Sequence, residues 1–115
     1  MSPKLPTLLT VIPNLAGGGA ERVLLLLLRE LAPRWRLVVV LFAGHLDYPG
    51  ELPAGVRVRF LNMPNPQGFG GLVGRLARII RAEQPDVVFS VLFHANLVTV
   101  PAHRLARSGA RLVLN

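Results

Sequence analysis

Residues 8–31 read LLTVIPNLAGGGAERVLLLLLREL, and this stretch decides the fold as a strand, a glycine-rich turn and a helix. Residues 8–12 are short, apolar and partly β-branched, which is typical of a strand buried on both faces. Gly17, Gly18 and Gly19 follow, and because glycine lacks a Cβ, the backbone there can approach another molecule closely. The first amides of the leucine-rich helix have no partner within the helix and point back into the turn.

Free amides and the positive end of the helix dipole together predict a site for an anion, most naturally phosphate. A structural interpretation stays open, because glycines also let a chain turn sharply and Glu21 can cap the first turn. A dinucleotide fingerprint is disfavoured, since Arg22 stands where glycine or alanine is needed. The Gly-Lys-Ser/Thr sequence of a nucleotide-hydrolase P-loop does not occur in the chain.

Length and composition set further bounds. The 115 residues suffice for one domain or part of a larger one, and 51% of them are hydrophobic. The longest apolar run of the first helix, residues 23–28, is far shorter than the ~20 residues of a membrane span. Residues 1–6 lack the apolar core of a secretory signal, so a cytoplasmic protein is predicted. Without cysteine, a zinc site would need histidine or carboxylate ligands, and we predict neither a metal nor a cofactor.

The charge is strongly basic, with 13 lysines and arginines against six acidic residues. Arginine binds phosphate through a planar fork of donors, so nucleic acid, anionic lipid and sugar phosphates are all compatible partners. A general compositional bias towards arginine accounts for the same excess without any partner.

Alternating strands and helices follow the opening unit, which predicts an α/β fold with a doubly wound parallel sheet. The periodicity predicts strands over residues 36–42, 56–61, 87–91 and 111–114, and helices over 72–83 and 96–108. The first strand is expected near the centre, and the alternating strand 56–61 near an edge. We expect Pro101 to kink or delay the last helix and Gly109 to cap it.

Helix faces can also be predicted. Leu24, Leu27, Leu28 and Leu31 form the expected core face of the first helix, which Leu25 and Leu26 broaden. The second helix is expected to leave its charged residues outside, namely Arg75, Arg78 and Arg81 or Glu83.

Two loops, residues 14–19 and 92–96, follow the first and fourth strands and are expected to meet at the carboxyl edge of the sheet, where such folds bind ligands. This places His94 on the same rim as the glycine turn. Without further information, a loop histidine bonded to neighbouring backbone is the preferred interpretation of His94. His45 and His103 are expected at the surface.

Three segments carry a family resemblance: NLAGGGAERV at 14–23, QPDVVFS at 84–90 and HANL at 94–97. In order and spacing they resemble the N-terminal domain of family 4 glycosyltransferases, and most closely bacterial enzymes that build lipid-linked or surface polysaccharides. The resemblance implies the GT-B fold, in which two Rossmann-like domains face each other across a cleft. It also implies retention of anomeric configuration and no obligatory metal.

The resemblance further implies roles for single residues. Gly17, Gly18 and Gly19 would face the donor diphosphate, and His94 would lie beside the transferred sugar as the catalytic residue. Asn14 and Asn96 would be lesser polar contacts on the rim. The partners implied are a nucleotide-sugar donor and a glycan or lipid-linked acceptor, and no nucleic acid is expected.

Residues 1–115 match only part of that N-terminal domain, so we expect a truncated acceptor-side half that is inactive alone. Phe69, Arg75, Arg78 and Arg81 could rest on an anionic membrane, although a solvated helix face is the preferred interpretation. The alternative function is a non-catalytic basic module for nucleic acid or an acidic partner, but aromatic residues for base stacking are few.

Overall fold

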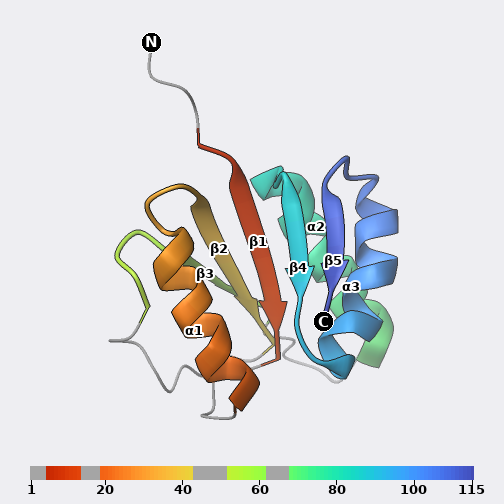
Figure 1. Cartoon of the computed structure of the whole chain (residues 1–115). Helices are drawn as coiled ribbons and strands as arrows, with labels where there is room; N and C mark the ends of the chain where they lie inside the picture. Colours follow the sequence, from red (N-terminus) through yellow and green to blue (C-terminus); the bar gives the residue numbers. More distant parts are fainter. Residues whose placement is uncertain (1–4, 14–18, 43–51, 62–67) are drawn as a thin grey trace.

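The computed structural model describes residues 5–13, 19–42, 52–61 and 68–115, excluding the side chains of residues 68 and 69. The strands form one sheet, and the helices between them lie against its two faces (Figure 1). In chain order they are β1 (Thr7–Ile12), α1 (Gly19–Leu31), β2 (Arg36–Leu41), β3 (Arg57–Phe60), α2 (Gly68–Glu83), β4 (Val87–Ser90), α3 (Phe93–Ala106) and β5 (Arg111–Leu114).

The five strands form one parallel sheet in the order β3-β2-β1-β4-β5. β1 lies at its centre and pairs with β2 from Thr7↔Arg36 to Ile12↔Leu41. All six residues of β1 are buried, as expected for a strand covered on both faces. The predicted doubly wound, Rossmann-like α/β fold is therefore confirmed, with the first strand central and β3 at an edge.

Successive residues of the strands serve two separate cores, because side chains alternate between the faces of a sheet. Leu8 and Ile12 of β1 pack on the face that α1 covers, together with Leu28. Leu9 and Val11 pack on the opposite face, which α2 and α3 cover together. One helix on one face and two on the other complete the three layers (Figure 1).

The expected core face of α1 needs one correction. Leu24, Leu25 and Leu28 are buried, whereas Leu27 is 38% exposed and Leu26 is 56% exposed. The leucine run offers several almost equivalent stripes, and the core on this face of the sheet contains Leu24 and Leu28 but not Leu27. With only leucines to compare, periodicity alone could not tell these faces apart.

Two helices begin earlier than predicted, α2 at Gly68 instead of residue 72 and α3 at Phe93 instead of residue 96. In α3 the buried stripe begins at Ala95 and continues through Ala102, so packing against the sheet fixes the helix from its first turn. Pro101 lies inside the helix and does not delay it.

The predicted cap at Gly109 is also wrong. α3 ends at Ala106, and its C-cap is Arg107, which adopts the left-handed conformation at φ 52° and donates its amide to the carbonyl of Arg104. Left-handed caps favour glycine, yet they also accept other residues at an energetic cost.

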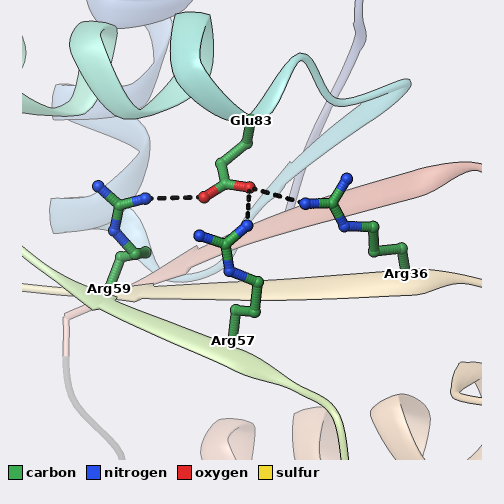
Figure 2. Close-up of polar contacts among 4 residues, drawn as sticks. All are labelled: Arg36, Arg57, Arg59 and Glu83. Atoms are coloured by element: carbon green, nitrogen blue, oxygen red, sulfur yellow. Dashed lines mark hydrogen bonds and ion pairs between the residues drawn. The ribbon is translucent and has the colours of Figure 1, made fainter.

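A buried carboxylate joins the sheet to α2. Glu83, the last residue of α2, has a side chain that is 2% exposed and lies among three arginines from β2 and β3 (Figure 2). Arg59 Nη1 donates to Glu83 Oε2 at 2.7 Å, and Arg57 Nη1 donates to Oε1 at 2.9 Å. Arg36 Nη2 is 3.6 Å from Oε1. The prediction that Glu83 stays outside is therefore wrong.

Replacement of Glu83 by Gln should destabilise the fold. The charge-assisted bonds to Arg57 and Arg59 become weaker neutral ones, so we expect the free energy of unfolding to fall by about 2 kcal/mol. Urea unfolding of Glu83→Gln measures the loss. Glu30→Gln, which removes the same charge from an exposed site of α1, is the matched control. Equal small losses in both variants would show that Glu83 acts only through net charge.

Candidate functional site

Gly19, His94 and Asn96 are the described candidate residues that lie at the carboxyl edge of the sheet. β1 is followed by α1 on one face, and its neighbour β4 is followed by α3 on the other (Figure 1). The point where the chain changes direction across the sheet thus lies between β1 and β4, which is where folds of this kind bind ligands. The backbone ties these ends together, since Val91 donates to the carbonyl of Val11 at 2.9 Å.

The glycine turn is described only at its last residue. Gly19 begins α1 and is exposed, and an added Cβ there would meet no heavy atom within 4 Å among the described residues. Gly17, Gly18 and Asn14 lie outside the described residues, so their assignment to a donor diphosphate remains a prediction. Glu21, in the first turn of the helix, is only 8% exposed.

His94 lies in the first turn of α3 with an exposed side chain. Its ring meets the edge of Phe93 at a centroid distance of 6.0 Å and an interplanar angle of 73°. Within the described part of the chain it has no hydrogen bond to backbone, which disfavours the interpretation as a loop histidine fixed by its neighbours. His103 does have such a bond, with Nε2 2.8 Å from the carbonyl oxygen of Ala110. His45 lies outside the described residues.

Asn96 lies one turn of helix away from Leu92. Its side-chain Nδ2 donates to the carbonyl of Asn115 at 3.1 Å, and its backbone amide donates to the carbonyl of Leu92. Its Oδ1 is buried and has no hydrogen-bond partner among the described residues. The side-chain Nδ2 of Asn96 therefore binds the residue that follows β5, while its Oδ1 remains an acceptor without a partner among the described residues.

Sequence reasoning missed the conformation of Leu92, the residue between β4 and α3. Leu92 has φ 80° and ψ 151°, a region that glycine adopts easily and leucine rarely does. As the N-cap of α3 it gives no side-chain hydrogen bond to the helix. This strained position sets the direction in which α3 leaves the sheet and hence where His94 lies. A leucine at this position gives no signal of it in the sequence.

The four residues of the predicted membrane contact are placed differently from one another. Arg75 and Arg78 are exposed on α2. Arg81 is exposed too, but its Nη2 donates to the carbonyl of Leu105 at 2.9 Å, which attaches α2 to the end of α3. The side chain of Phe69 lies outside the described residues.

The described residues contain neither a membrane-spanning helix nor a cluster of metal ligands. No helix there has both the length and the apolar character needed to cross a membrane. No three histidine, cysteine or acidic residues among them lie close enough together to hold a metal ion.

Comparison with known proteins supplies one match. The family model described as Glycosyltransferase Family 4 matches residues 17–115. The matched stretch begins in the glycine turn and includes all of α3, so both parts of the rim lie inside it. No curated protein matches the chain significantly.

Substitutions of Leu92 should reveal its strain. Alanine and glycine both remove the side chain that packs against the α1 core, but only glycine adopts this φ without cost. We therefore expect Leu92→Gly to be more stable than Leu92→Ala by about 1 kcal/mol, measured by urea unfolding. An alanine variant as stable as the glycine variant, or more so, would contradict strain at this position.

Proposed function

The chain belongs to glycosyltransferase family 4, and we propose that it forms the acceptor-side half of a retaining transferase. In this proposal a hexose passes from a nucleotide-sugar to a lipid-linked or surface polysaccharide acceptor. The donor is held mainly by a second, C-terminal domain that faces this one across the cleft of a GT-B fold. The observation that carries the proposal is the position of His94, exposed in the first turn of α3 beside the switch point of the sheet.

The proposed chemistry divides the rim into two parts. The start of α1 presents backbone amides and the positive end of a helix dipole, which suit the diphosphate of the donor. Negative charge grows on that diphosphate as the glycosidic bond to the leaving nucleotide breaks, so donors fixed in advance lower the barrier. Gly17, Gly18 and Gly19 fill this role, and glycine lets the diphosphate come close to the backbone.

The second part of the rim holds the sugar. His94 can donate or accept a hydrogen bond, and the lack of a hydrogen-bond partner among the described residues leaves its ring available to a sugar hydroxyl. Asn96, two residues further along α3, adds the acceptor Oδ1, which is buried and has no partner among the described residues, and Asn14 is the polar contact proposed after β1. The acceptor glycan would enter against this domain.

Nucleotide titration tests the proposed diphosphate site. We expect UDP or GDP to shift the amide resonances of Gly19 and Ala20 and the ring resonances of His94, measured by NMR on the 115-residue chain. His94→Ala should weaken binding several-fold because the ring lines the site, whereas Leu105→Ala, an exposed position near the other end of α3, should leave it unchanged.

The same titration separates the proposal from its alternative. Tight, salt-sensitive binding of a short oligonucleotide with no response to either nucleotide would favour a basic binding module. The chain alone is expected to transfer no sugar, since the proposed donor-binding half is not part of it. Robust transfer by these 115 residues would contradict that division of labour.

We also propose that α2 brings the protein to an anionic membrane through Phe69, Arg75, Arg78 and Arg81. Exposed arginines on one helix attract anionic lipid headgroups, and an aromatic neighbour can enter the interface. Membrane contact at this helix would bring the carboxyl edge close to a lipid-linked acceptor.

Vesicle flotation tests the membrane contact. We expect the chain to float with vesicles of phosphatidylcholine and phosphatidylglycerol but not with phosphatidylcholine alone. The double variant Arg75→Gln/Arg78→Gln should lose most of this binding. Arg34→Gln/Arg104→Gln removes two exposed charges elsewhere and should retain it. Equal, negligible flotation with both kinds of vesicle would exclude the contact.

A further inference from the structure

A second candidate site lies away from the carboxyl edge, between β3 and α2. Arg59, Phe60, Arg75, Arg78 and Ile79 line a pocket there with a volume of about 280 Å³. Three of its five lining residues are arginines, and no acidic residue is among them. We propose that this pocket binds a phosphate group, in the form of a phosphomonoester or free phosphate. The proposal depends on neither the transferase assignment nor the membrane contact.

The charge around the pocket is unbalanced. Glu83 is the carboxylate that Arg59 contacts, and the same carboxylate also serves Arg57 and Arg36. Three guanidinium groups thus share one negative charge (Figure 2), and Arg75 and Arg78 add two further positive charges near the pocket. Asp86 is occupied elsewhere, because its Oδ2 accepts the amide of Thr7 at 2.8 Å.

Arg75 and Arg78 have no hydrogen-bond or ion-pair partner within the described part of the chain. Arg81, one turn beyond Arg78 on α2, is bonded to the carbonyls of Leu105 and Ala106 and thus serves the fold. Arg81 and the arginines around Glu83 make contacts that connect elements of the fold, whereas Arg75 and Arg78 make no such contact among the described residues. Their repulsion from Arg59 is a cost that a bound anion would remove.

The chemistry of the lining favours phosphate over a single negative charge. Guanidinium groups present planar pairs of donors that match phosphate oxygens, and three of them can divide the charge of a dianion. Ile79 adds apolar surface beside the arginines, which lowers the local dielectric constant and strengthens each charged contact. Among the described residues the pocket has a volume of about 280 Å³, which suits one phosphate group better than an extended polyanion.

Two variants with the same charge test the site. Arg75→Gln/Arg78→Gln removes two lining residues, whereas Arg34→Gln/Arg104→Gln removes two exposed arginines elsewhere. Arg59 is left intact because Glu83 depends on it. We will measure binding of inorganic phosphate to the 115-residue chain by NMR of the arginine Nε–H groups, with circular dichroism to confirm folding. The lining variant should bind at least about tenfold more weakly, and the control should change by less than about twofold.

Binding to vesicles of two compositions identifies the source of the phosphate group. Phosphatidylcholine vesicles with phosphatidic acid present a monoester, and those with phosphatidylglycerol present only a diester. Tighter binding to phosphatidic acid vesicles than to phosphatidylglycerol vesicles, with this preference lost in the lining variant and kept in the control, supports the site with a lipid headgroup as its ligand. Three results would overturn the proposal: binding to neither probe, equal weakening in both variants, or tight oligonucleotide binding without a response to phosphate.

Discussion

Burial of β1 on both faces is the constraint on which the other features depend. Every one of its residues is buried, so one face must be covered by α1 and the other by α2 and α3. Parallel neighbours on both sides require that each helix carry the chain back to the start of the next strand. The starts of α1 and α3 consequently meet at the carboxyl edge, one on each face. His94 and Gly19 share a rim for this reason, and the proposed cleft chemistry needs no other device to bring them there.

The basic charge of the chain is divided among distinct tasks and does not form one uniform surface. Arg57 and Arg59 extend from an edge strand to a buried carboxylate, and Arg81 holds the end of a neighbouring helix. Exposure alone would group Arg81 with Arg75 and Arg78, although its hydrogen bonds set it apart. Bonding partners, more than net charge, therefore indicate which cations are available to a ligand.

The sequence predicted the architecture because apolar β-branched runs and their spacing leave few alternatives to a parallel sheet. Local detail was harder to predict. Pro101 suggested a late start for α3, but the buried stripe from Ala95 determined the boundary. Glu83 was expected outside because its partners Arg57 and Arg59 lie 26 and 24 positions away in sequence. At the candidate site, the rim position of His94 followed from the topology, whereas the strained backbone of Leu92 resembles nothing that a leucine normally adopts. The anion site of the glycine turn remains a prediction, since Gly17 and Gly18 lie outside the described residues.

The two edge strands of the sheet, β3 and β5, differ in how well they suit pairing with a further strand. β3 carries Arg57 and Arg59, whose like charges repel a second copy of the same strand. β5 has only Arg111 at its start, followed by Val113 and Leu114, which are 39% and 48% exposed. Because charged residues discourage edge-to-edge pairing and exposed apolar residues permit it, the described part of the sheet is better suited to pairing with a further strand beside β5 than beside β3.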